Sequence, residues 1–107
     1  MAQIVSEVKD NGETLFIKID GVFSFELNRQ FSDTYRSAPE SVERFVIDFS
    51  QVEYVDSSAL GILLVMKKTG EEHGVNEFSL INCRQNIADV MLVCHFDDIF
   101  NLTRLEE

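Results

Sequence analysis

The chain lacks tryptophan and contains a single proline, Pro39, and only five glycines among its 107 residues. It has no proline- or glycine-rich linker and no low-complexity segment, so disorder and a division into two domains are both disfavoured. Hydrophobic residues make up 45% of the chain, enough for one core of its own. We therefore expect one compact domain spanning residues 1–107.

Long apolar runs are also missing. No stretch approaches the roughly 20 residues that a membrane-spanning helix needs, and the N-terminal residues lack the basic-then-apolar order of a signal peptide. These features predict a cytoplasmic protein without direct membrane insertion. Basic residues are few, nine against nineteen acidic ones, which gives a formal charge of -10. Such a charge repels phosphate backbones, so a nucleic-acid partner is not expected.

Residues that carry catalysis are scarce. Cys83 and Cys94 form no Cys-x-x-Cys pair and lie in mostly apolar sequence, which predicts buried, reduced thiols rather than a disulfide or a metal site. His95 follows Cys94 directly, and neighbours in a helix point apart rather than forming a nucleophilic pair. The acidic pairs at 71–72 and 97–98 are expected to be solvated, and no glycine-rich phosphate-binding motif is present. We expect no catalysis, no cofactor and no metal.

The first half of the chain predicts a hairpin followed by a helix. Strand-like runs at Gln3–Val8 and Thr14–Asp20 flank Asn11-Gly12, a strong signal for a turn between antiparallel strands. Aliphatic residues at 15, 17 and 19 alternate with other residues and should share one face of the second strand. Apolar residues at three- and four-residue spacing then predict an amphipathic helix over Ser24–Ser37, capped by Ser24 and ended by Pro39.

The second half alternates strands and helices. Phe45–Phe49 is apolar on both faces, as in a parallel sheet covered by helices. A nearly all-apolar, deeply packed helix is expected from Ser57 to about Thr69. It is followed by a strand at Glu77–Asn82, a helix striped by Ile87, Val90, Met91 and Cys94, and a last strand at Ile99–Leu102. The order predicts an α/β fold: a mixed, mostly parallel sheet of about five strands, with an N-terminal β-hairpin and three to four helices.

The most informative segment is Val55–Gly61, where a strand pattern ends in a polar triplet and a helix pattern begins at once. Free backbone N–H groups and the positive end of the helix dipole meet at such a point, so Ser57 lies where a phosphoryl group is tolerated. Asp and Ser before an apolar helix are also ordinary N-caps. Both interpretations of Ser57, cap and modified switch, are open at the level of local pattern.

The chain resembles the bacterial STAS domains of the anti-sigma factor antagonist family. The resemblance spans the whole sequence and rests on the opening hairpin, Gly21, the strand Phe45–Phe49 and above all the run Asp56-Ser57-Ser58-x-Leu60-Gly61. It implies the STAS fold and a partner-switching role without catalysis. A serine kinase that doubles as anti-sigma factor would bind the unphosphorylated protein and release it after phosphorylating Ser57, and a serine phosphatase would reverse the modification.

The resemblance also implies a partner-binding surface. Its expected members are Asp56, Ser58, Ala59, Leu60 and Gly61, joined by the loop from Val22 to Phe25 before the first helix, in particular Phe23, Ser24 and Phe25. Two positions depart from the family pattern, and both bear on partner choice. Ala59 stands where the family usually has glycine, and Gly21-Val22-Phe23-Ser24 lacks the family's acidic residue. Core packing of Phe23 and Phe25 is the alternative to a surface role.

Two other functions fit the same family. A STAS subunit that is never phosphorylated could serve as an accessory of an ABC-type lipid transporter, which requires a permanent apolar docking face. The same kinase chemistry could also control biofilm formation or secretion rather than a sigma factor. The pattern favours no particular oligomeric state.

Overall fold

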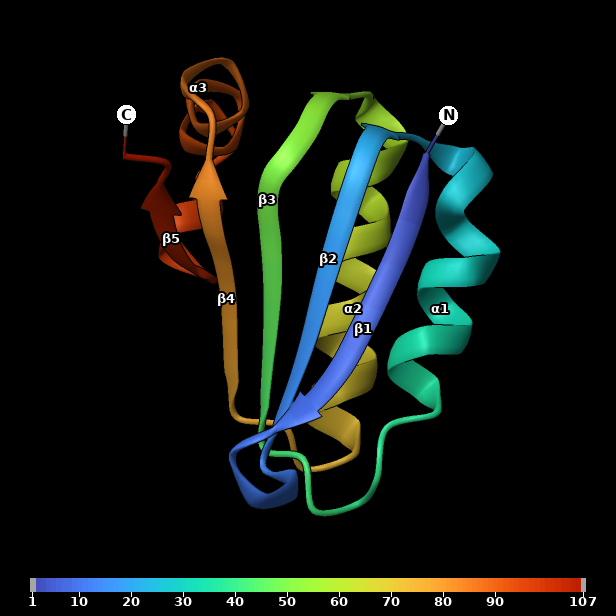
Figure 1. Ribbon diagram of the computed structural model, residues 1–107. Helices are drawn as coiled ribbons and strands as arrows, with labels where there is room; N and C mark the ends of the chain where they lie inside the picture. The colour runs from blue at the N-terminus through green and yellow to red at the C-terminus, as the bar shows by residue number, and fades with distance from the viewer. Residues whose placement is uncertain (1, 107) are drawn as a thin grey trace.

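The computed structural model describes residues 2–106 and contains one five-stranded sheet with three helices (Figure 1). The sheet order follows the chain order, β1-β2-β3-β4-β5. The strands are β1 (Gln3–Lys9), β2 (Thr14–Phe23), β3 (Arg44–Val55), β4 (Glu77–Cys83) and β5 (Asn101–Arg104), and the helices are α1 (Asn28–Arg36), α2 (Ser57–Glu72) and α3 (Gln85–Val93). The α/β class, the five strands and the three helices confirm the fold expected from the sequence.

The predicted hairpin is present. β1 and β2 pair antiparallel, and a 3₁₀ turn at Asp10–Gly12 joins them. All three turn residues have positive φ, which asparagine, aspartate and glycine tolerate best. The remaining neighbours β2, β3, β4 and β5 pair parallel, each connected to the next through a helix. The strands of the parallel part therefore all end at the same edge of the sheet.

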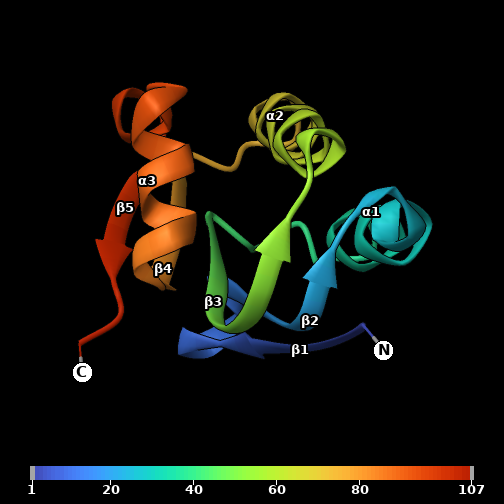
Figure 2. The ribbon, with the colours of Figure 1, turned by 90° about the horizontal axis from the view of Figure 1, so that it is seen from above.

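Helices α1 and α2 lie on one side of the sheet, and α3 lies over β4 beside β5, as the view from above shows (Figure 2). The alternating residues Leu15, Ile17 and Ile19 of β2 are buried on that side, as predicted. The expectation that β3 is covered on both faces is wrong. Val46 is only half-buried, as is its register neighbour Phe16 in β2, and Lys18, two residues further along β2 on the same face, is exposed. Polar residues are tolerated there because no helix packs on that face.

Helix α2 is buried along one face only, although its sequence is apolar nearly all round. Ala59, Ile62, Leu63 and Met66 are among its buried residues, whereas the outward-facing Leu64 and Val65 are exposed. The predicted deep packing is therefore found on one face of α2 only, because α2 has the sheet on one side and solvent on the other. Near its end, Gly70 fits against Phe78, whose ring atom Cε1 would lie 2.8 Å from an added Cβ.

Several boundaries differ from the predicted ones. Ser24 does not cap α1: it precedes a 3₁₀ turn at Phe25–Leu27, its side chain makes no capping bond, and α1 begins only at Asn28. The central strand extends through the polar residues after Phe49 to Val55, since its pairing with β2 continues past two register shifts. The last strand begins at Asn101, after a 3₁₀ turn.

The two cysteines differ in their surroundings. Cys83 is buried, as expected, but Cys94 is exposed, because α3 ends at Val93 and Cys94 lies beyond the face that packs on the sheet. Burial is the main cause that raises the pKa of the Cys83 thiol to about 12, with a further contribution from the Asp48 carboxylate. Cys83 therefore stays protonated in neutral solution.

Candidate functional site at the start of helix α2

The start of α2 lies at the edge where β2 and β3 end side by side. The register pairs Phe23, the last residue of β2, with Val55, the last residue of β3. The backbone N–H of Asp56 donates to the Phe23 carbonyl over 3.2 Å, which fixes the beginning of α2 against the end of β2. The segment after β2 is therefore held beside the Asp56-Ser57-Ser58 triplet, as the resemblance implied.

Asp56, not Ser57, is the N-cap of α2. Its backbone is extended, and its side-chain oxygen Oδ1 accepts hydrogen bonds from the Ala59 N–H over 3.1 Å and from the Ser58 hydroxyl over 2.6 Å. The Ser58 hydrogen bond is the main cause that lowers the pKa of the Asp56 carboxyl below its ordinary value. Asp56 is consequently ionised at neutral pH and occupies the capping position.

Ser57 is the first residue of α2, and its side chain is exposed. Because Asp56 provides the cap, the Ser57 hydroxyl is not required to satisfy the first turn. The neighbouring Ser58 is different: it is half-buried and its hydroxyl donates to Asp56. Of the two serines, Ser57 is thus the one that an external enzyme can reach without breaking an internal hydrogen bond.

The residues expected on the partner surface differ in their exposure to solvent. Ser57 and Gly61 are exposed, Asp56, Ser58, Leu60 and Ser24 are half-buried, and Phe25 is 67% exposed. Phe23 and Ala59 need correction, because both side chains are fully buried. The Phe23 ring packs against Phe31 and Phe49, with ring centroids 5.4 and 6.1 Å away. The Ala59 methyl lies in the core, so it does not stand between α2 and a partner.

The sequence placed the loop from Val22 to Phe25 on this surface, but it gave no sign of a further exposed side chain at this edge, that of Tyr54. Val22 and Tyr54 are register neighbours near the ends of β2 and β3, and Tyr54 is 59% exposed. We call Val22, Phe25 and Tyr54 the apolar rim. The alternation of apolar residues in each strand did not reveal it, because register shifts in the β2–β3 pairing change which side chains face outward.

A second exposed feature continues from Ser57 along α2. Ser57, Gly61, Leu64, Val65 and Lys68 recur at three- and four-residue spacing and are all exposed, so they form one outer stripe on the helix. Gly61 has nothing within 4 Å of an added Cβ. The serine therefore lies at one end of an exposed stripe that includes the apolar Leu64 and Val65, and the helix backbone is open to another protein at Gly61.

Within residues 2–106, no group of three or more His, Cys, Asp or Glu side chains is arranged to hold a metal ion. Over the same residues, none of the helices has the length and hydrophobicity needed to cross a bilayer. What the site offers chemically is an accessible hydroxyl beside a helix N-terminus, bordered by apolar side chains.

Comparison with known proteins matches residues 6–104 to the family described as "Mlab, STAS domain". A STAS-domain containing protein of Pseudomonas aeruginosa (strain UCBPP-PA14) is 32% identical over 94 residues, which cover 87% of this chain and 91% of that protein. The family match includes the Asp56–Gly61 segment.

Three solved structures share the fold. A putative anti-sigma factor antagonist from Thermotoga maritima superposes with a TM-score of 0.79 at 17% identity, covering 94% of this chain and 85% of that one. The phosphorylated form of the Bacillus cell fate determinant SpoIIAA superposes with a TM-score of 0.69 at 16% identity, covering 98% of this chain and 93% of that one. A sulfate transporter family protein from Wolinella succinogenes superposes with a TM-score of 0.77 at 15% identity, covering 91% of this chain and 80% of that one. With the family match over nearly its whole length and the fold of solved anti-sigma factor antagonists, this chain belongs to the STAS domain family.

Proposed function

We propose that this protein is an anti-sigma factor antagonist that works by partner switching, without catalysis of its own, in the cytoplasm. In its unphosphorylated form it binds a serine kinase that is also an anti-sigma factor. That kinase transfers the γ-phosphoryl group of ATP to the Ser57 hydroxyl oxygen, the hydroxyl proton is lost, and ADP leaves. The modified protein then dissociates until a serine phosphatase hydrolyses the phosphate. The observation that carries this proposal is that Asp56 fills the capping position while Ser57 remains exposed.

Electrostatics supports release without unfolding. A phosphoserine adds about -1.5 to -2 charge and three acceptor oxygens. The N–H groups and dipole of α2 favour that charge in the free protein, so the fold has no reason to change. Asp56 already places a carboxylate next to Ser57. The added phosphate concentrates negative charge on the surface that a partner must desolvate, which weakens docking.

The direct test is phosphorylation of the purified protein by its candidate kinase with ATP, followed by peptide mass spectrometry. Label on Ser57 that disappears in Ser57→Ala and persists in Ser58→Ala supports the assignment. The Ser58→Ala variant is the matched control, since it removes the neighbouring hydroxyl that is bonded to Asp56. A protein that is never modified by any kinase it binds contradicts the switch.

A binding experiment tests the consequence of modification. Ser57→Ala should bind the kinase constitutively, and Ser57→Asp should bind it weakly, because only the second variant adds negative charge at the docking surface. Affinities measured by calorimetry should differ by at least about tenfold, which corresponds to about 1.4 kcal/mol. Equal affinities of the two variants would count against the mechanism.

A second function is favoured by the exposed outer stripe of α2. Leu64 and Val65 form a permanent apolar surface, which an accessory subunit of a membrane transporter needs, and one fold neighbour is a sulfate transporter family protein. This alternative predicts co-purification with a transporter ATPase and no phosphate on Ser57 in cells. Recovery of a phosphorylated fraction from cells together with a small serine kinase would decide for the switch.

A further inference from the structure

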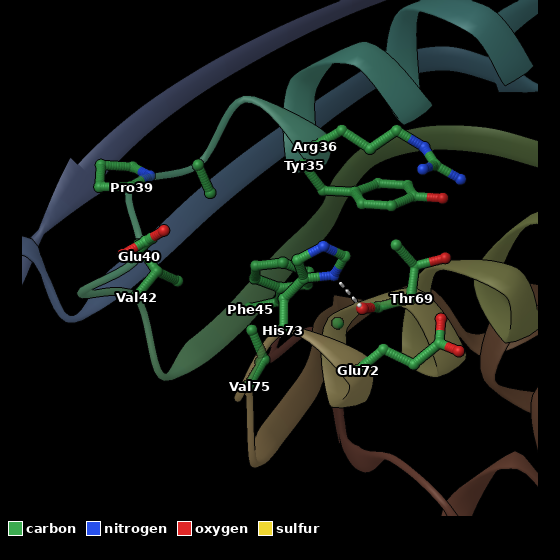
Figure 3. Close-up of a pocket in the computed structure, with 12 residues that line it drawn as sticks. Tyr35, Arg36, Pro39, Glu40, Val42, Phe45, Thr69, Glu72, His73 and Val75 are labelled. Atoms are coloured by element: carbon green, nitrogen blue, oxygen red, sulfur yellow. Dashed lines mark hydrogen bonds between the residues drawn. The ribbon is translucent and has the colours of Figure 1, made fainter.

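A cavity of about 590 Å³ opens at the end of the molecule away from Ser57. It lies where the last turn of α1, the last turn of α2 and the first residues of β3 meet, and Figure 3 shows the side chains around it. Its volume falls in the range of about 300–1,000 Å³ that is typical of small-molecule sites. One wall is apolar and includes Pro39, Val42, Phe45 and Val75.

Two hydroxyl groups open into this cavity from side chains that are otherwise buried. Tyr35 is 4% exposed and Thr69 is 9% exposed. Within residues 2–106 neither hydroxyl has a hydrogen-bond partner in the protein, and no fully enclosed side-chain oxygen lacks one, so both oxygens are accessible, and both residues line the cavity. In Figure 3 the two oxygens lie at the same end of the cavity. Since the protein's own hydrogen bonds do not use them, both hydroxyls are available for a bound molecule.

Charges of both signs accompany the hydroxyls. Arg36 donates through Nε to the Ser32 hydroxyl over 2.9 Å, which orients the guanidinium and leaves its two terminal nitrogens free. Glu72 brings a carboxylate from α2, and Figure 3 shows Arg36 and Glu72 at the end of the cavity that holds the hydroxyls. The His73 Nδ1 lies 2.8 Å from the Thr69 carbonyl, so Nδ1 carries the hydrogen and Nε2 remains open.

We propose that this cavity binds a small zwitterion with an apolar side chain, the chemical class of the apolar α-amino acids. The carboxylate would lie against Arg36 and the hydroxyls of Tyr35 and Thr69, the ammonium group against Glu72, and the side chain against the apolar wall around Phe45. A purely anionic ligand would meet the negative field of a chain with a net charge of -10, whereas a zwitterion does not. The site is separate from Ser57 and does not depend on the proposed switch.

The test is a nuclear magnetic resonance titration of the isotope-labelled full chain with L-phenylalanine and L-leucine. Saturable shifts confined to residues 35–45 and 69–75 support the site. Two analogues of L-phenylalanine serve as matched probes: 3-phenylpropionate lacks the ammonium group and 2-phenylethylamine lacks the carboxylate. Each should bind at least about tenfold more weakly. The absence of saturable shifts with both amino acids, or equal binding of the analogues, overturns the proposal.

Variants locate the recognition groups. Tyr35→Phe and Thr69→Val keep the packing, and each should weaken binding about three- to tenfold, as expected for one neutral hydrogen bond. Arg36→Gln changes an exposed side chain, so it keeps the fold testable should either core variant unfold, and it should weaken binding at least about tenfold. Ser57→Ala should leave the affinity unchanged. Wild-type affinity in all three cavity variants, each shown to be folded by circular dichroism, contradicts the assignment.

Discussion

Asp56 and Ser57 are adjacent residues with separate roles, and the distinction depends on single hydrogen bonds. The Asp56 carboxylate accepts from Ala59 N–H and from the Ser58 hydroxyl, so the first turn of α2 is capped before Ser57 takes part. A serine that served as the cap would lose that bond on phosphorylation. Here the modification can change the charge of the surface and leave the cap intact.

The cap leads to a prediction about acid stability. Because the folded-state pKa of Asp56 is lowered, its ionised form contributes stability that is fully present above the unfolded pKa of about 3.9. That contribution is lost as the pH falls through the folded pKa. Asp56→Asn should therefore be less stable than the wild type at neutral pH, and the difference should shrink below about pH 4. Thermal unfolding from pH 7 to 2 measures this, and identical pH profiles would contradict it.

The cysteines give a second prediction at this scale. Cys94 is exposed, whereas Cys83 is buried and its pKa is raised to about 12. A thiolate-specific reagent at pH 8 should label one thiol per folded molecule, since only Cys94 is accessible. Cys94→Ser should remove the labelling, and in denaturant Cys83 should react as well. Rapid labelling of the folded Cys94→Ser protein would show that Cys83 is reachable.

At the scale of a secondary-structure element, α2 contains two glycines with opposite surroundings. An added Cβ at Gly61 meets nothing within 4 Å, but at Gly70 it would lie 2.8 Å from Phe78 Cε1 and 3.1 Å from Phe45 Cε2. Gly61→Ala should raise the free energy of unfolding by about 1 kcal/mol through helix propensity. Gly70→Ala should lower it by about 1–3 kcal/mol through overpacking. Urea unfolding of both variants measures the difference, and stabilisation by Gly70→Ala would show that Phe78 moves aside without cost.

The elements were largely predictable because their signals are local. The hairpin follows from Asn11-Gly12, the inward face of β2 from its alternating aliphatic residues, and the start of α2 from Asp56-Ser57-Ser58. The outer stripe of α2 was not predictable, since an apolar residue such as Leu64 does not itself reveal that no element covers it. The cavity was missed for a related reason: Tyr35 and Thr69 come from different helices, and only the packed structure brings their hydroxyls together.

At the scale of the whole molecule, phosphorylation should act on binding and not on folding. An anion at a helix N-terminus interacts with the dipole by about 0.3–1 kcal/mol, so the unfolding temperature of protein modified on Ser57 should stay within about 5 °C of the unmodified form. Calorimetry of the two forms measures this. A fall of the unfolding temperature by much more than about 5 °C would mean that the phosphate disrupts the folded domain. The proposal that the added charge alone releases the partner would then be wrong.

Helix α2 joins the two ends of the molecule, since it begins at Ser57 and contributes Thr69 and Glu72 to the cavity. Its 16 residues span about 24 Å, which is several times the Debye length of about 8 Å at physiological salt. Direct electrostatic interaction between a phosphate on Ser57 and an amino acid in the cavity is therefore largely screened. If the two sites are coupled, the coupling must be transmitted by a displacement of helix α2. Amino-acid binding would then change the equilibrium of phosphorylation, and phosphorylation would change the affinity for the amino acid by the same factor.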